Sequence, residues 1–157
     1  MTVFHGSDRA ITNPDILHSR KNVDFGPGFY VTPLLEQAKS WSRKFARRNG
    51  KAVVSRYALD EACFQSRKTL RFDAYNEAWL DFVLSCRRGL DRSDYEIVMG
   101  GVANDRVFDT IELLMNGLID KSTALGRLRY EKPNYQICLR SQAVIDGFLQ
   151  WLGSETP

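Results

Sequence analysis

The chain is poor in cysteine and has no long apolar run, and each shortage excludes a class of protein. Its three cysteines, Cys63, Cys86 and Cys138, lie far apart and include no Cys-x-x-Cys pair. A disulfide framework and a zinc site are therefore not expected, which favours a reducing compartment. No apolar stretch approaches the roughly 20 residues that cross a bilayer, and the first residues lack the pattern of a signal peptide. We therefore expect a cytoplasmic protein.

A surplus of charge of one sign is also lacking. The 22 Lys and Arg residues against 19 Asp and Glu residues give a formal net charge of +3. This mild charge permits an acidic partner or a nucleic acid without indicating either. With 157 residues, of which 43% are hydrophobic and 26% charged, the composition is globular. Residues 1–157 are expected to form a single domain, which is large enough to bury a core.

Short predicted strands and helices are mixed along the chain without the regularity of βαβ units, so an α+β fold is expected. Thr32, Asp105 and Ser141 are expected to cap helices at their N-termini. Strands are predicted at 2–5, 29–31, 52–57, 69–72, 95–99 and 135–139. Helices are predicted at 33–49, around 79–86, at 106–114, 121–128 and 142–151.

A Gly-Pro-Gly turn leads into a Phe-Tyr-Val strand. Gly26 and Gly28 carry no Cβ, so they suit unusual dihedral angles or the close approach of a ligand. Pro27 fixes one dihedral angle between them and stiffens the turn. Tyr30 therefore stands on a strand whose entry is rigid.

Three residues that carry functional groups lie on or beside three separate predicted strands. Taken singly, His5, Tyr30 and Gln136 each have an ordinary structural explanation, and their flanking sequences make a function more plausible. The three blocks are His5-Gly6-Ser7, Phe25-Gly26-Pro27-Gly28-Phe29-Tyr30 and Asn134-Tyr135-Gln136-Ile137-Cys138-Leu139.

In order and spacing, these blocks resemble the ADP-ribosyltransferase superfamily, in particular its His-Tyr-Glu branch of poly-ADP-ribose polymerases and diphtheria toxin. The likeness spans 5–149. It looks closer to a family of small bacterial ADP-ribosyltransferase-like proteins, some of them thought to be toxins encoded beside a neutralising partner. The resemblance implies a split β-sandwich of two small antiparallel sheets, flanked by helices around an NAD cleft. NAD would be the co-substrate, and no metal is expected.

The resemblance also implies roles for single residues. His5 would hydrogen-bond the adenosine ribose, the backbone of Gly6 would hold the nicotinamide carboxamide, and Tyr30 would stack on the nicotinamide ring. Ser7 would either bind the carboxamide or satisfy its own turn. Trp41 would either supply a second stacking ring or pack in the core.

Two arginines are candidates for the NAD pyrophosphate, because a guanidinium donates two parallel hydrogen bonds. Arg9 follows the first block, and Arg106 lies between a predicted strand and helix. Gly28 would let NAD approach the turn closely. No Walker loop or dinucleotide fingerprint is present, so the NAD would not be bound in Rossmann fashion.

Gln136 departs from the family pattern, which has glutamate there. Glutamine keeps the hydrogen bonds and loses the charge, and a charge pair at ~4 Å is worth ~4 kcal/mol at an effective dielectric near 20. Losing a group aimed at transition-state charge commonly costs ~10²–10³ in rate. Poly-ADP-ribose elongation is therefore not expected. Glu131, just upstream, would substitute if the strand had a different register.

The expected function is an NAD-dependent mono-ADP-ribosyltransferase with His5, Tyr30 and Gln136 as its active constellation. It would transfer ADP-ribose to a protein or nucleic-acid acceptor and release nicotinamide, as the toxin of a bacterial toxin–antitoxin pair with a neutralising antitoxin protein. Two alternatives stay open: an NAD glycohydrolase, and a non-catalytic module that binds NAD or ADP-ribose.

Overall fold

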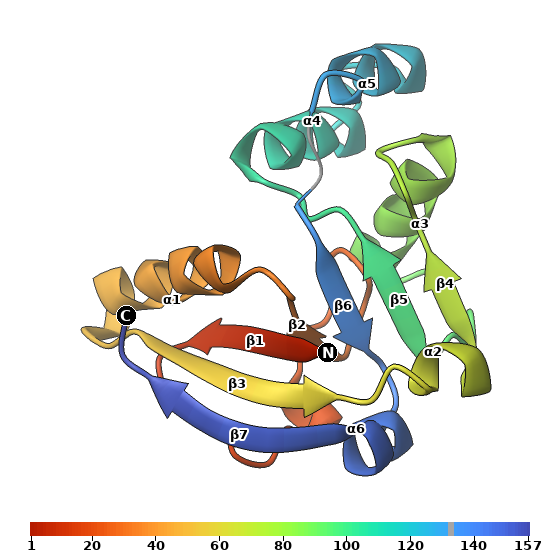
Figure 1. The fold of residues 1–157 in the computed structure, drawn as a ribbon. Helices are drawn as coiled ribbons and strands as arrows, with labels where there is room; N and C mark the ends of the chain where they lie inside the picture. Colours follow the sequence, from red (N-terminus) through yellow and green to blue (C-terminus); the bar gives the residue numbers. More distant parts are fainter. Residues whose placement is uncertain (132–133) are drawn as a thin grey trace.

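Two small sheets form the centre of the protein, as the computed structural model shows for residues 1–131 and 134–157, with only the backbone of Asn49 described (Figure 1). The predicted α+β class is confirmed. The first sheet has the order β1-β3-β7, from β1 (Thr2–Ser7), β3 (Val53–Leu59) and β7 (Leu149–Glu155). The second has the order β2-β6-β5-β4, from β2 (Phe29–Val31), β6 (Gln136–Leu139), β5 (Ile97–Gly100) and β4 (Thr69–Arg71).

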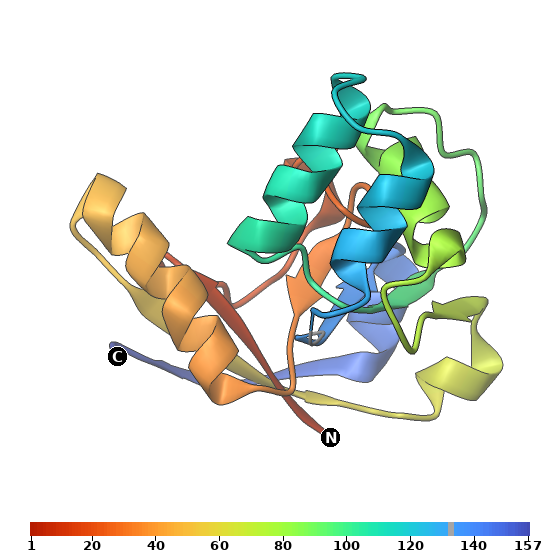
Figure 2. The same ribbon diagram turned by 90° about the horizontal axis from the view of Figure 1, so that it is seen from above.

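The helices lie around these sheets, and none in the described ranges is long and apolar enough to cross a membrane. A short 3-10 helix, η1 (Ile16–His18), follows β1. The α-helices are α1 (Leu35–Asn49), α2 (Cys63–Ser66), α3 (Glu77–Arg87), α4 (Asp105–Met115), α5 (Lys121–Leu128) and α6 (Gln142–Phe148). Helix α1 lies along β1, whereas α3, α4 and α5 gather on one side of the second sheet (Figures 1 and 2).

Each face of the second sheet carries its own hydrophobic core. Ile97 of β5 and Ile137 of β6 pack with Val3 and Tyr57 of the first sheet. On the opposite face, strand side chains pack against apolar residues of α3, α4 and α5, among them Val98, Cys138, Trp79, Ile111 and Leu128. Because both faces are covered, the central strands read as nearly continuous apolar runs.

The second sheet is mixed, so the expectation of two antiparallel sheets is wrong at one edge. Strand β4 pairs with β5 in parallel, with Thr69 opposite Ile97. The chain passes from β4 to β5 through α3, and such a crossover brings the next strand back in the same direction.

Helix α1 starts later than predicted. Thr32 does not cap it, because Thr32 exchanges two backbone hydrogen bonds with Phe4 of β1, of 2.8 and 2.9 Å, which keep it extended. Its Oγ1 accepts from the backbone N–H of Leu34 at 3.1 Å, and the helix begins at Leu35.

Two other predicted caps also differ. Asn104 caps α4 in place of Asp105, since its Oδ1 accepts from the backbone N–H of Val107 at 3.0 Å. Ser141 stands at the N-cap position of α6 without a side-chain hydrogen bond.

The predicted C-terminal helix is shorter, because its last part forms β7. This strand pairs with β3 along the edge opposite β1, with Leu59 facing Leu149 and Val54 facing Glu155. The Trp151 ring lies edge-on to Tyr57 at 5.5 Å between centroids. Pairing with an available strand edge outweighs the helical spacing, a choice that only tertiary context decides.

Gly6 marks the closest approach of α1 to β1. A Cβ at this position would lie 2.1 Å from the carbonyl oxygen of Ala38 and 2.8 Å from the nitrogen of Ser42. Both are backbone atoms of the helix, so they do not move aside as a flexible side chain would. The helix therefore needs a glycine at this point of β1.

Gly6→Ala is expected to lower the free energy of unfolding by about 2–3 kcal/mol or more, because the methyl group overpacks against helix backbone. The control is Gly126→Ala in α5, where an added Cβ meets nothing within 4 Å. There the better helix propensity should raise stability by about 0.5–1 kcal/mol. Urea unfolding of both variants measures the difference, and similar effects would contradict this packing.

Candidate functional site

The candidate site lies where β1 and β2 separate. Phe4 directs its N–H and C=O toward Thr32, and backbone groups alternate between the two edges of a strand. The N–H and C=O of Gly6 therefore face the same edge. No described residue hydrogen-bonds to them across that edge. This place, formed by His5, Gly6 and Tyr30, is referred to below as the strand parting.

His5 joins the two strands at the parting. Its Nδ1 lies 2.7 Å from the carbonyl oxygen of Tyr30. Since a carbonyl oxygen only accepts, Nδ1 carries the proton and Nε2 is an acceptor. Burial lowers the pKa of His5, and this hydrogen bond opposes that shift in part. The ring stacks on Phe29 at 4.6 Å between centroids, and Nε2 bonds to no described residue.

The Tyr30 hydroxyl secures the glycine turn. It donates to the carbonyl oxygen of Gly26 at 2.6 Å and accepts from the backbone N–H of Phe25 at 3.0 Å. Burial raises the pKa of Tyr30 well above its ordinary value, so the hydroxyl stays protonated. The hydroxyl is thus occupied by hydrogen bonds within the turn. Only the half-buried ring of Tyr30 is available for contact with a ligand.

The two glycines of the turn are explained by backbone conformation and by close packing. Gly26 has a φ of 74°, the left-handed conformation that suits glycine. A Cβ on Gly28 would lie 2.5 Å from the Cys138 Sγ and 2.8 Å from the carbonyl oxygen of Leu139. Gly28 therefore lets the turn approach β6, and its expected role toward a ligand stays a prediction.

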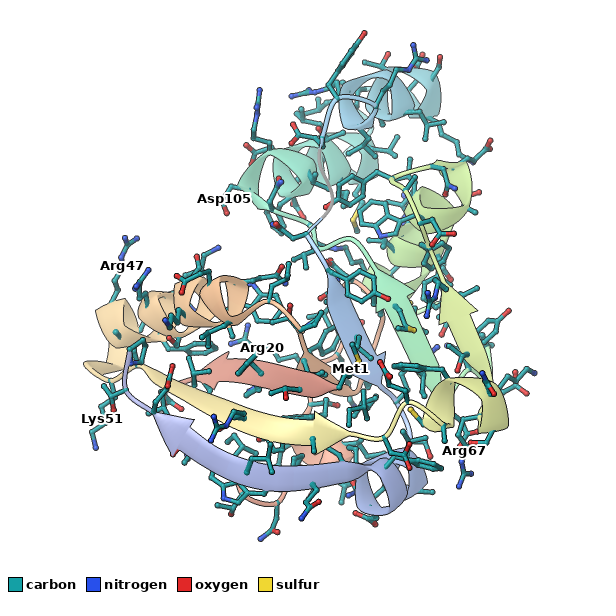
Figure 3. All side chains as sticks on the ribbon, in the orientation of Figure 1. Met1, Arg20, Arg47, Lys51, Arg67 and Asp105 are labelled. Atoms are coloured by element: carbon teal, nitrogen blue, oxygen red, sulfur yellow. The ribbon has the colours of Figure 1, made fainter. Side chains whose placement is uncertain are left out.

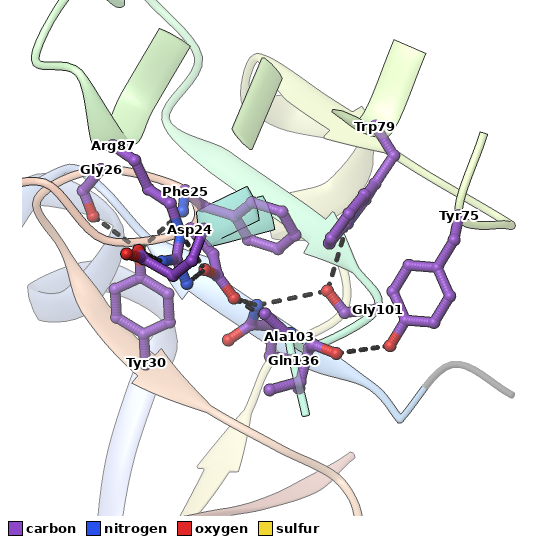
Figure 4. Close-up of polar contacts among 12 residues, drawn as sticks. Asp24, Phe25, Gly26, Tyr30, Tyr75, Trp79, Arg87, Gly101, Ala103 and Gln136 are labelled. Atoms are coloured by element: carbon purple, nitrogen blue, oxygen red, sulfur yellow. Dashed lines mark hydrogen bonds and ion pairs between the residues drawn. The ribbon is translucent and has the colours of Figure 1, made fainter. Parts of the chain in front are cut away.

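Gln136 stands on β6 as predicted, opposite Gly100 of β5, whereas Glu131 precedes the strand. Gln136 is 3% exposed. Its Nε2 donates to the Asp24 Oδ2 at 3.4 Å and to the carbonyl oxygen of Gly101 at 3.3 Å (Figure 4). No described residue bonds to Oε1. Every fully buried side-chain N or O atom among the described residues has a partner, so Oε1 reaches solvent.

Asp24 is the centre of this polar cluster. Arg87 of α3 donates to its Oδ1 from Nε at 3.0 Å and from Nη2 at 2.6 Å. The backbone N–H of Ala103 donates to Oδ2 at 3.1 Å. Sequence reasoning assigned no role to Asp24 or Arg87. An acidic residue just before the Phe-Gly pair was a visible signal, but its partner lies 63 residues away.

Register places Tyr30 and Gln136 on one face of the second sheet. Tyr30 lies opposite Cys138, and residues two apart on a strand share a face. The His5 ring lies with Phe29, which belongs to the core on the other face. The structure thus places Tyr30 and Gln136 on one face, whereas the His5 ring lies with the core of the other face and reaches Tyr30 only through its carbonyl oxygen.

Three other predicted site residues, Ser7, Arg9 and Arg106, form hydrogen bonds or ion pairs with residues outside the strand parting. Ser7 Oγ donates to the carbonyl oxygen of Arg9 at 2.6 Å, so it satisfies its own turn. The Arg9 Nε lies 3.0 Å from the Asp8 Oδ1. Arg106 has a side chain 85% exposed, with its Nε 3.5 Å from the Glu131 Oε1. Each arginine thus pairs with a carboxylate at the surface.

Trp41 belongs to neither core cluster of the described residues, although it is half-buried on α1. Its helix is tied to the strand of Gln136 by the Gln37 amide, which donates to the Tyr135 carbonyl oxygen at 2.8 Å and accepts from its N–H at 3.2 Å. The stacking role of Trp41 stays a prediction.

The chain matches the model of one protein family, DUF3990, over residues 1–150. It belongs to the DUF3990 family. The family is described as proteins of unknown function, so membership indicates no activity. No curated protein and no solved structure matches the chain.

Other features of this DUF3990 protein lie apart from the strand parting. A cavity of about 700 Å³ is lined by 12–17 together with α6 and Leu149. Another of about 390 Å³ lies over β1, β3 and β7. Within the described ranges, no three His, Cys, Asp or Glu side chains group as metal ligands. Arg47 lies exposed in the last turn of α1 (Figure 3). The Lys44 Nζ lies 3.4 Å from the Asp105 Oδ1.

The stability of this protein is expected to fall as the pH drops from 7 to about 5.5. Unfolded His5 binds a proton near pH 6.5, whereas the folded form, with its lowered pKa, binds it only at lower pH. The contribution of neutral His5 to stability is therefore present above about pH 6.5. It is lost as the pH falls toward the pKa of His5 in the folded state, with a slope of at most about 1.4 kcal/mol per pH unit. Urea unfolding at several pH values measures it.

The chain has a matched control, because it contains two histidines. His5→Gln should remove this part of the slope, and His18→Gln, at an exposed position, should keep it. A slope that disappears with His18 instead would show that His5 is not the responsible group.

Gln136→Glu is expected to lower the free energy of unfolding by about 2–4 kcal/mol at pH 7. The carboxylate loses both N–H donors and faces the acceptors of Asp24 and Gly101. The loss of stability caused by Gln136→Glu should be smaller in an Asp24→Asn background, where the negative charge at position 24 is absent. Urea unfolding of the four proteins tests this, and equal losses in both backgrounds would exclude Asp24 as the cause.

Proposed function

We propose that this protein binds NAD at the strand parting and transfers its ADP-ribose unit to a macromolecular acceptor with release of nicotinamide. One observation supports the proposal: the residues that the resemblance requires lie on strands that meet where β1 and β2 separate. They are His5 with its acceptor Nε2, Gly6 with a backbone that no described residue pairs across that edge, Tyr30 with its ring and, on the adjoining strand, Gln136 with Oε1.

The arrangement of the sheets supports an ADP-ribosyltransferase-like split sandwich. The isolated bridge between Phe4 and Thr32 connects the two sheets at the neighbouring edges of β1 and β2. Beyond it the strands diverge, and the His5 ring takes the place of the next strand-to-strand hydrogen bond. A gap of this kind offers main-chain donors and acceptors to a ligand.

The chemistry of these groups suits NAD. Breaking the bond between nicotinamide and ribose produces an oxocarbenium-like ribose and a neutral leaving group, so orientation supplies much of the catalysis. His5 Nε2 and Gln136 Oε1 accept hydrogen bonds, as ribose hydroxyls require. The N–H and C=O of Gly6 match the two ends of a carboxamide. The acceptor's nucleophilic atom would bond to the ribose carbon and lose its proton.

A second candidate is a module that binds NAD or ADP-ribose without turnover. The observation that favours it is the amide of Gln136, which supplies no negative charge at the ribose. A group that stabilises developing charge in the transition state is commonly worth ~10²–10³ in rate. Binding needs only the hydrogen bonds, which the amide retains.

Trp41 offers the cleaner test of the site, because the Tyr30 hydroxyl also secures the turn. Trp41→Leu is expected to weaken NAD binding about 2- to 10-fold, as loss of a stacking ring worth ~0.5–1.5 kcal/mol predicts. Trp41→Phe keeps a ring and should retain most of the affinity. Isothermal titration calorimetry measures both, and unchanged affinity in Trp41→Leu would place the ligand elsewhere.

Nicotinamide release from NAD, with and without cell lysate, separates the candidate functions. Release that requires lysate indicates a transferase, and release without lysate indicates a glycohydrolase. Binding without release indicates the module. Absence of NAD binding by the wild-type protein would overturn the proposal.

A further inference from the structure

We propose that Asp24 is a positioning residue, which orients the Gln136 amide so that its Oε1 accepts a hydrogen bond from a hydroxyl of the nicotinamide ribose. The inference rests on the proposed function and deepens it. It concerns an acid that the resemblance assigns no role, and it explains how a glutamine serves where the family pattern has a glutamate.

The orientation of the Gln136 amide follows from its two neighbours. Nε2 faces the Oδ2 of Asp24 at 3.4 Å and the carbonyl oxygen of Gly101 at 3.3 Å. An ionised carboxylate and a peptide carbonyl are acceptors only, so each demands an N–H. Turning the amide over would lose both hydrogen bonds and bring oxygen against oxygen.

Both acceptors are themselves held in place. Arg87 donates twice to one oxygen of Asp24, and the backbone N–H of Ala103 donates to the other. The carbonyl oxygen of Gly101 also accepts from the Trp79 indole Nε1 at 3.2 Å (Figure 4). The Arg87 guanidinium lies over the Phe108 ring at 4.9 Å. Groups from α3, α4 and the β5–α4 loop thus fix the amide before any ligand arrives.

Only Oε1 is then available to a ligand. It reaches solvent and lies on the face that Tyr30 shares. A group that meets it has to donate, which selects a hydroxyl and excludes a phosphate or carboxylate oxygen. For NAD with its nicotinamide on Tyr30, that donor is a hydroxyl of the adjoining ribose. Asp24 therefore does not contact the ligand itself. It determines which atom of the Gln136 amide faces the ligand.

The test compares the dissociation constants of NAD and of two analogues that lack the 2′- or the 3′-hydroxyl of the nicotinamide ribose. The wild type is expected to bind one analogue about tenfold more weakly than NAD, as the loss of one hydrogen bond predicts. In Asp24→Asn the one side-chain oxygen is drawn to Arg87, so the NH₂ group faces Gln136 and opposes the orientation that the Gly101 carbonyl oxygen still favours. With its amide no longer held in one orientation, that variant should bind NAD and both analogues within about twofold of one another.

Asp91→Asn is the matched control. Asp91 also pairs with an arginine, since Arg140 Nη2 lies 2.5 Å from its Oδ2, and the side chains of both pairs are 11–13% exposed. This variant should lose a similar ion pair and still distinguish the analogues. A general loss of rigidity would abolish the discrimination in both variants, and that result would overturn the inference.

A measurement on the wild type covers the case in which Asp24→Asn does not fold. Because Nε2 donates to two acceptors, both Nε2 protons of Gln136 should exchange slowly with solvent in nuclear magnetic resonance spectra, and rapid exchange of both protons would overturn the inference. Failure of the proposed function has a different signature, because wild-type protein would then bind neither NAD nor the analogues. Discrimination that persists in Asp24→Asn would reject the positioning role while the proposed function stands.

Discussion

The buried carboxylate of Asp24 is the constraint on which the candidate site depends. A charge taken out of water is tolerated only when it is paired and hydrogen-bonded, and Asp24 has partners on three other elements. Its position just before the glycine turn connects that turn to α3, to the start of α4 and to β6. Breaking the cluster would leave the largely buried Arg87 with only the more distant Glu112 Oε1 at 3.9 Å among the described carboxylates, so the cluster favours one arrangement of segments far apart in the sequence.

The second sheet differs between its centre and its edge at β2. Its two faces are covered by two hydrophobic cores, which secure β5 and β6 from both sides. The edge of β2 is different, because it contacts β1 at one bridge, beyond which no described residue pairs with the Gly6 backbone across that edge. Unpaired strand edges invite another strand or a ligand. Here the His5 ring fills the first part of the gap through its hydrogen bond to the Tyr30 carbonyl oxygen, so the two strands do not present a continuous free edge.

Glutamine at position 136 therefore has a structural explanation of its own. Seen only as a missing glutamate, it indicates a weakened enzyme. Seen within the cluster, it is the residue whose N–H groups satisfy Asp24 and the Gly101 carbonyl, and glutamate would conflict with both. The negative charge is still present in the neighbourhood, but Arg87 compensates it. This arrangement suits firm binding of a hydroxyl better than strong stabilisation of a cation.

The sequence by itself determined the α+β class, the positions of most strands and the placement of Gln136 on β6, because these follow from local apolar patterning and turn residues. It also indicated Tyr30 and the rigid turn before it. Only the tertiary structure decided that β4 runs parallel to β5, that the chain ends in β7, and that Gly28 faces β6. It alone joined Asp24 to Arg87 and Gln136. These outcomes depend on which edges and buried charges meet in space, and a hydrogen bond between residues 112 positions apart leaves no local pattern to read.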